Sequence, residues 1–251
     1  MLLISTLFFA TRTLGQDTSA EAIPVNAPPI DFSQSQVPIN NCVNANDWAI
    51  TLDDGPSKNI PAVLQILRDK AAVATFFVNG RNFADLVGNQ QDKDNLASVF
   101  AAGHQIATHT FEHPDLTTLS VQAIYDQMRS NDIAIRNIIG VRPIHFRLPF
   151  LSTNDVVNAA IGTWGYRTVG VNVDTKDYQF SSLALADAVA GNQQSYLAAL
   201  SLNPSSVISL NHDFTTQITA WLPAMIDDIR ARGFNLVNIQ TCLGDPAAYR
   251  P

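Results

Sequence analysis

Two adjacent aspartates, Asp53 and Asp54, follow a short apolar run and precede a Gly-Pro break. The run, residues 48–50, is typical of a buried strand, and the break indicates a turn that lets both side chains serve one site. Two like charges this close are costly unless a cation or a shared proton relieves them. One carboxylate could therefore hold a metal ion while the other takes a proton. The alternative is an acidic, solvated turn.

A pair of imidazoles, His109 and His113, lies further along the chain. Residues 109–113 match the His-x-x-Glu-His pattern of some zinc peptidases, but that pattern needs a helix. The strand-like sequence before His109 and the proline that follows His113 argue against a helix. A strand end followed by a turn can still bring both rings to one ion, and with Asp54 they form a ligand set that zinc favours. The alternative is that one histidine is a capping or surface residue.

Arg147 and Phe150 follow another predicted strand and flank a proline. The guanidinium of Arg147 could form a two-point bond with a carboxylate and keep that carboxylate ionised and aimed. Because the proline fixes the turn, the backbone N–H of Phe150 could point at a developing oxyanion. A purely structural ion pair is the alternative for Arg147.

The segment 174–178, Asp-Thr-Lys-Asp-Tyr, follows a further strand. An aspartate of this segment could bond to a histidine ring and raise its pKa. Tyr178 could offer a flat wall to a sugar, and an ordinary charged loop is the alternative. His212 ends the next strand and is interpreted as catalytic because of that position, whereas His104 and His145 are interpreted as structural.

These residues need elements that bring them to one rim. Strands are predicted at 48–52, 72–78, 104–109, 144–148, 166–173, 206–211 and 234–239, and helices at 60–70, 93–102, 117–139, 153–163, 182–200 and 216–232. The alternation implies parallel strands with helices outside, and it favours one α/β barrel-like domain of about seven strands over a doubly wound open sheet. Active groups in such a barrel sit at the carboxyl ends of strands, where this chain has Asp53, Asp54, Asn79, His109, Arg147, Asp174 and His212.

Local signals mark some of the helix ends. Ser57 is predicted to cap the first helix, with Pro61 inside its first turn. Gly103 and Gly233 follow predicted helices at the usual left-handed stop position.

The composition is that of a folded, acidic protein. The chain has 251 residues, of which 46% are hydrophobic and 15% are charged, and its net charge is −7. The absence of a basic excess argues against a nucleic-acid partner. Residues 1–20 read as a secretory signal with cleavage near 15–20, although no Lys or Arg precedes the apolar run. Residues 21–41 are predicted to form a loose lead-in, and no other stretch is long enough to span a membrane.

The chain has two cysteines, Cys42 and Cys242. An even count in a secreted chain predicts a disulfide, which would tie the start of the domain to its end. In the chain-entropy account, closing so long a loop stabilises the fold by up to about 5 kcal/mol. Two separate buried thiols are the alternative.

Taken together, these segments resemble the polysaccharide deacetylase family, carbohydrate esterase family four. The five motifs of that family appear in order, at residues 51–56, 109–113, 147–150, 174–178 and 210–212. The ending Thr-Cys-Leu-Gly-Asp and the stretch 75–80 look most like secreted fungal chitin deacetylases. The resemblance implies a distorted β/α barrel, with a catalytic domain over 42–245.

The resemblance also implies a role for each matching residue. Asp53 would be the general base, oriented by Arg147, and His212 the general acid, assisted by Asp177 in preference to Asp174. The metal ligands would be Asp54, His109 and His113. Phe150, Tyr178 and Leu210 would contact substrate, with the Phe150 N–H helping to hold the oxyanion. Leu52, Phe150 and Tyr178 replace the more usual Phe, Tyr and Trp of the family, and the changes at Leu52 and Tyr178 put substrate preference in doubt.

The implied activity is zinc-dependent hydrolysis of N-acetyl groups from N-acetylglucosamine polymers, with Co²⁺ as a possible substitute metal. The expected protein is a secreted monomer of the extracellular space or cell wall, with no nucleic-acid partner. The same site could serve an O-acetyl esterase on xylan, or a deacetylase of peptidoglycan or another N-acetylated glycan. A glycosidase with paired carboxylates and a non-catalytic sugar-binding relative are the other readings.

Overall fold

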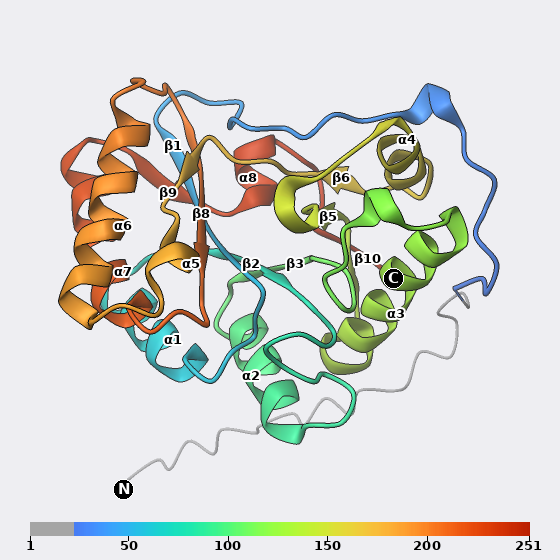
Figure 1. Cartoon of the computed structure of the whole chain (residues 1–251), viewed down its shortest axis with the longest axis horizontal. Helices are drawn as coiled ribbons and strands as arrows, with labels where there is room; N and C mark the ends of the chain where they lie inside the picture. The colour runs from blue at the N-terminus through green and yellow to red at the C-terminus, as the bar shows by residue number, and fades with distance from the viewer. Residues whose placement is uncertain (1–22) are drawn as a thin grey trace, which may run out of the picture.

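The computed structural model describes residues 23–251, so the proposed signal segment falls outside the described residues. A curled sheet of parallel strands forms the centre, and helices cover its outer face (Figure 1). The strand order is β6-β5-β3-β2-β1-β8-β7, with β9 paired to β1. The strands are β1 (Asp47–Asp53), β2 (Thr75–Val78), β3 (Gln105–Thr108), β5 (His145–Phe146), β6 (Arg167–Thr168), β7 (Val173–Asp174), β8 (Val207–His212) and β9 (Asn235–Val237).

The two ends of this strand order lie next to each other in sequence. Only residues 169–172 separate β6 from β7, and four residues can span no more than about 14 Å. The sheet must therefore curl until its ends almost meet, which makes it a distorted barrel and rules out the open sheet. The prediction of a single strand over 166–173 is wrong, because this stretch forms two strands, β6 and β7, at opposite ends of the strand order. Ile39 from the lead-in pairs with Val169 in the gap.

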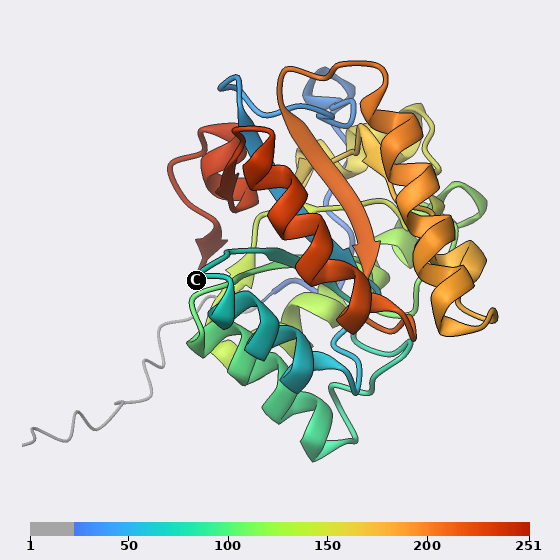
Figure 2. The same ribbon diagram turned by 90° about the vertical axis from the view of Figure 1, so that its left-hand side faces the viewer.

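Six long helices pack around the barrel, and each corresponds to a predicted helix. They are α1 (Ile60–Asp69), α2 (Gln90–Ala101), α3 (Val121–Ile139), α4 (Asp155–Thr163), α6 (Leu185–Leu200) and α7 (Ile218–Ala231). Figure 2 shows α7 running alongside β8, with α6 on the other side of that strand in this view. Short elements that the sequence did not indicate are α5 (Asp177–Phe180), α8 (Ile239–Leu243), η1 (Phe32–Gln34), η2 (Leu116–Thr118), η3 (Pro149–Leu151) and the antiparallel pair β4 (Arg142–Pro143) with β10 (Tyr249–Arg250).

The ends of the helices follow most of the local signals. Gly103 and Gly233 have φ values of 84° and 83° and end their helices in the left-handed region, as predicted. The prediction that Ser57 caps the first helix is wrong. The cap position of α1 is Asn59, and the Ser57 hydroxyl accepts the backbone N–H of Asn59 instead. Ser57 serves the turn before the helix, a role that the spacing to Pro61 does not reveal.

The period-two alternation of β1 sorts its side chains between two environments. Trp48, Ile50 and Leu52 face outward into the main apolar core beneath α1 and α7. Thr51 and Asp53 face inward, where both contact the same buried guanidinium. The strand that carries the first candidate residue therefore contributes both to the core and to the site.

The lead-in and the C-terminal end are both fixed to the barrel. The Tyr125 hydroxyl donates to the carbonyl of Pro24, and the Trp164 indole N–H donates to the carbonyl of Pro28. The segment expected to be loose is thus bound along α3 and α4 over its described part. The predicted Cys42–Cys242 disulfide is confirmed, with a Cα–Cα distance of 4.4 Å across 200 residues of sequence. Within residues 23–251, no helix is long and apolar enough to cross a membrane.

Candidate active site

The carboxyl ends of β1, β3, β7 and β8 surround a cavity of about 340 Å³. Most of the side chains predicted for the site line this cavity: Asp53, Asp54, His109, His113, Phe150, Asp174, Tyr178, Leu210 and His212. The remaining two, Arg147 and Asp177, are fully buried behind it. Asn79 also follows a strand, but its side chain donates to the carbonyls of His109 and Thr110 and so shapes the His109–His113 turn.

One carboxylate and two imidazoles gather on one side of the cavity. Asp54 Oδ1 lies 3.4 Å from His109 Nε2 and 3.2 Å from His113 Nε2. The His109 Nδ1–H donates to the carbonyl of Arg147 at 2.8 Å, which leaves the Nε2 lone pair directed at Asp54. Asp54 and His113 adopt left-handed backbone conformations, with φ values of 71° and 59°. Two tight turns therefore bring the three side chains together.

The electrostatics of this trio suit a divalent cation. Burial lowers the pKa of His109 well below its usual value and the pKa of His113 to about 4, so both rings are neutral and offer lone pairs. Burial raises the pKa of Asp54 to about 7. Asp54 Oδ1 has no hydrogen-bond partner among the described residues. A buried, unpartnered carboxylate oxygen facing two neutral imidazoles fits a metal ion such as zinc.

Asp53 faces a different partner. Its Oδ1 accepts a hydrogen bond from Arg147 Nη1 at 2.7 Å. The guanidinium is fully buried, donates also to the carbonyls of Val169 and Gly170, and stacks over the Phe77 ring at 4.1 Å. Burial raises the pKa of Asp53, while the Arg147 charge opposes that rise. Arg147 thus fixes the direction of the Asp53 carboxylate. It also binds the backbone that connects β6 to β7.

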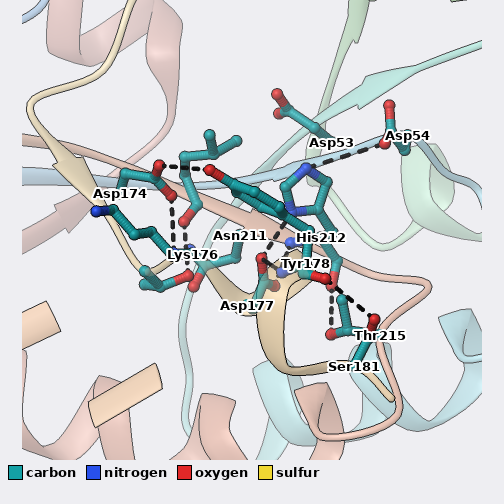
Figure 3. Close-up of polar contacts among 12 residues, drawn as sticks. Asp53, Asp54, Asp174, Lys176, Asp177, Tyr178, Ser181, Asn211, His212 and Thr215 are labelled. Carbon is teal, nitrogen blue, oxygen red and sulfur yellow. Dashed lines mark hydrogen bonds and ion pairs between the residues drawn. The ribbon is translucent and has the colours of Figure 1, made fainter. Parts of the chain in front are cut away.

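His212 ends β8, next to Asp53 in the strand register, and is held by Asp177. The His212 Nδ1 is 2.7 Å from Asp177 Oδ1, and Asp177 Oδ2 accepts the His212 backbone N–H at 2.7 Å (Figure 3). Burial by itself lowers the pKa of His212, but the carboxylates of Asp177, Asp53 and Asp54 together outweigh it, and the pKa rises to about 9. Asp174 instead accepts the Lys176 N–H and the Tyr178 hydroxyl. Of the two candidate aspartates, only Asp177 contacts the imidazole.

Two aromatic side chains flank the mouth of the cavity. Phe150 is 68% exposed and Tyr178 is 43% exposed, so each presents ring surface to solvent. Their rings pack edge-on against His113 and His212 respectively. The backbone at Phe150 is left-handed, with φ 57°, as is that of the next residue. Such strain in non-glycine residues is characteristic of functional turns.

Sequence reasoning missed several residues of the site. The Thr51 hydroxyl donates to the carbonyl of Ser209 and accepts from Arg147 Nη1, the same group that donates to Asp53. Its position two residues before Asp53 on a strand could have indicated this. Leu148 and Leu151 line the cavity beside Phe150. Asp213 is fully buried next to His212, and no local pattern pointed to it.

The barrel and the cavity at the carboxyl ends of its strands have the arrangement of a β/α-barrel enzyme. A family model described as polysaccharide deacetylase matches residues 40–169, more than half of the chain. The chain belongs to the polysaccharide deacetylase family.

Its relatives within that family include two fungal proteins described as chitin deacetylases. The one from Colletotrichum lindemuthianum is 35% identical over 96% of each chain, and the one from a Pestalotiopsis species is 35% identical over 88% of this chain and 73% of that protein. The solved structure of a chitin deacetylase from Colletotrichum lindemuthianum superposes with a TM-score of 0.80. It is 34% identical in sequence, covering 85% of this chain and 95% of that one. The distorted barrel expected from the motifs is therefore confirmed.

Proposed function

We propose that this protein hydrolyses the N-acetyl groups of N-acetylglucosamine polymers, chitin or chitooligosaccharides, and releases acetate. The observation that carries the proposal is a pair of differently tuned groups that line one cavity from neighbouring strands. Asp53 ends β1 and is bound to Arg147, and its register partner His212 ends β8 and is bound to Asp177. The chitin deacetylases that match the chain over most of its length support the same substrate class.

Asp53 is the proposed general base. Its pKa is raised by burial, so its carboxylate is more basic than that of a free aspartate, while Arg147 holds one oxygen and leaves the other toward the cavity. A water molecule beside the acetamide carbon would lose its proton to Asp53 as it attacks.

His212 is the proposed general acid. Asp177 bonds Nδ1 and favours the charged ring, so Nε2 carries a proton toward the cavity. That proton would pass to the sugar nitrogen as the carbon–nitrogen bond breaks. The backbone N–H of Phe150 is proposed to hold the developing oxyanion, and the rings of Phe150 and Tyr178 to hold the sugar, with Leu210 against the acetyl group.

The proposed metal ligands are Asp54, His109 and His113, with zinc as the proposed ion and Co²⁺ as a substitute. When bound, a divalent ion would polarise the acetamide oxygen and lower the pKa of a coordinated water. The chain supplies neutral rings and a fixed carboxylate for this purpose. The open side of the trio faces the cavity.

The test is acetate release from a panel of acetylated polymers. We expect the purified protein to release acetate from chitin oligomers without shortening them, to lose that activity with a chelator, and to regain it with zinc. Peptidoglycan and acetylxylan in the same panel separate the closest alternatives, a peptidoglycan deacetylase and an O-acetyl esterase. Shortened oligomers would indicate a glycosidase, and binding without acetate release would indicate a sugar-binding relative.

The proposal includes a secreted, monomeric protein that acts in the extracellular space or cell wall. The disulfide supports an oxidising compartment, because such bonds are rare in the cytosol. The experiment is to express the full chain in a eukaryotic host and to measure its distribution between medium, wall and cell extract. Retention in the cytosol would contradict the proposed location.

A further inference from the structure

The turn that carries Asp54 is held in an unfavourable backbone conformation. Asp54 has φ 71°, a left-handed value that non-glycine residues rarely adopt. Contacts to the end of β2 hold one side of this turn. The Asp54 N–H donates to the carbonyl of Phe77, and the Gly55 carbonyl accepts the N–H of Asn79. These bonds do not restrain the following residues, 56–59.

Asp213 holds the other side of the same turn. Its Oδ2 accepts the backbone N–H of Ser57 at 3.3 Å, and its carbonyl accepts the Ser57 hydroxyl at 3.0 Å and the Asn59 side-chain amide at 2.8 Å. Asp213 is fully buried and directly follows His212 at the end of β8. One residue thus joins the turn after β1 to the strand end that carries the proposed acid.

The absence of a side chain at Gly55 leaves room for the Asp213 carboxylate. A Cβ at position 55 would lie 2.0 Å from Asp213 Oδ2, so any larger residue would push the carboxylate or the turn out of place. The close approach places the Asp213 carboxylate against the backbone of the residue next to Asp54. A shift of the Asp213 side chain therefore moves Asp54 relative to the His109 and His113 rings, which lie on other elements.

We infer that Asp213 is a positioning residue for the metal-ligating carboxylate. It does not touch substrate or the proposed metal. Its carboxylate packs against Gly55 and accepts the Ser57 N–H, and these contacts keep Asp54 Oδ1 within reach of both imidazoles. This inference rests on the proposed function, since it concerns the metal site of that function.

The test measures the affinity of the metal-free full-length protein for zinc, by competition with a chromophoric chelator. We expect Asp213→Ala to raise the zinc Kd by about tenfold or more, the size usual for residues behind a ligand. Asp213→Asn keeps an oxygen for the Ser57 N–H, and we expect its Kd to stay within about threefold of the wild type. The absorption spectrum of the Co²⁺-loaded protein should change in Asp213→Ala and not in Asp213→Asn.

Asp132→Ala is the matched control. Asp132 is also a buried aspartate, 1% exposed, but it accepts from Tyr166 and pairs with Arg250 beside α3. We expect this variant to lose stability while its zinc Kd stays unchanged. A fall in affinity in Asp132→Ala equal to that in Asp213→Ala would mean that general destabilisation explains both, and the inference would be wrong.

Gly55→Ala provides a second route should Asp213→Ala fail to fold, because the added methyl group should weaken zinc binding on its own. Where Asp213→Ala does fold, the Gly55→Ala, Asp213→Ala double variant should lose no more affinity than Asp213→Ala, because the carboxylate that the methyl group meets is gone. Wild-type affinity in Gly55→Ala would overturn the inference and leave the proposed function intact. A wild-type protein that binds no zinc would overturn both.

Discussion

At the scale of single residues, the division of work between Asp53 and Asp54 follows from their surroundings. Asp53 is the last residue of a regular strand and points at a buried guanidinium. Asp54 lies in a left-handed turn and points at two neutral imidazoles. A cationic neighbour favours the ionised carboxylate, which can accept a proton, whereas a carboxylate beside two neutral imidazoles completes a set of lone pairs that suits a metal ion. Adjacent and chemically identical side chains are thereby suited to the different roles proposed for them.

Asp53→Asn tests the proposed base. The amide cannot accept a proton, so we expect kcat to fall by about 10²–10⁴-fold while the zinc Kd changes little. Acetate release and zinc content by elemental analysis are the two measurements. Asp54→Asn is the comparison variant, and it should lose bound zinc as well as activity. More than a tenth of wild-type turnover in Asp53→Asn would contradict the assignment.

Asp177→Asn tests the pairing of His212. The proposed acid works in its protonated form, and against the effect of burial the surrounding carboxylates, Asp177 first among them, raise the pKa of that ring to about 9. Removing the negative charge should lower this pKa, so the decline of kcat on the alkaline side should begin at lower pH. The measurement is the pH profile of acetate release. Asp174→Asn is the control, because Asp174 does not contact the imidazole, and an equal shift in that variant would contradict the pairing.

At the scale of elements, the sequence predicted the helices and strands whose formation depends on the local pattern of residues. The six long helices and strands β1, β2, β3 and β8 were found because their apolar residues recur with a regular period. The stretch 166–173 is rich in valine and other strand-favouring residues, so it was predicted as one strand. Its division depends on distant residues, since Arg147 and Ile39 bond to the backbone between β6 and β7.

The candidate site shows the same contrast. Motif residues at strand ends could be predicted, because parallel strands bring their carboxyl ends to one rim. The choice between Asp174 and Asp177 was weak from sequence, because it depends on how the chain turns after β7. That turn includes the left-handed Lys176, with φ 52°, which sends Asp177 inward beneath His212. Asp213 could not be found at all, since its partners lie more than 150 positions away in sequence.

Asn131 connects helix α3 to the last residues of strands β2 and β3. It is fully buried on α3, and its amide donates to the carbonyl of Val78 and the hydroxyl of Thr108, each at 2.8 Å. Asn131→Ala leaves these buried acceptors with fewer donors, so we expect a loss of about 1–3 kcal/mol in the free energy of unfolding. Urea denaturation measures the loss.

Asn137→Ala is the control for this variant, because Asn137 is exposed on the same helix. It should change stability by no more than about 0.5 kcal/mol. Equal midpoints for the two variants would show that α3 does not hold the ends of β2 and β3 through Asn131.

At the scale of the whole molecule, the two ends of the barrel differ: one end holds the candidate site, and the other is closed by apolar packing and the disulfide. The cavity opens where β1 and β8 end, at Asp53 and His212. The opposite end is closed by α8, whose apolar residues share a core cluster with Cys42, Ala49 and Ile208. The disulfide lies at this closed end, where the Cys42 sulfur is 3.5 Å from the carbonyl of Val207 at the start of β8. Stability and catalysis should therefore respond separately to changes at the two ends.

Cys42→Ala together with Cys242→Ala tests this separation. Without the bond, the unfolded chain regains the entropy of a loop that spans 200 residues of sequence, so we expect the free energy of unfolding to fall by up to about 5 kcal/mol. The melting temperature should fall by roughly 10–20 °C, because about 2–4 °C accompany each kcal/mol in a chain of this size. At 25 °C the folded variant should keep its kcat within about twofold and its zinc Kd unchanged, because the cavity lies at the other end of the barrel.

Each single variant controls for the loss of one sulfur atom, and both should be as unstable as the double variant, since either removes the same bond. A double variant that kept wild-type stability would contradict the stabilising role of the bond, and one that was folded but lost zinc affinity would show that the closed end of the barrel governs the site after all.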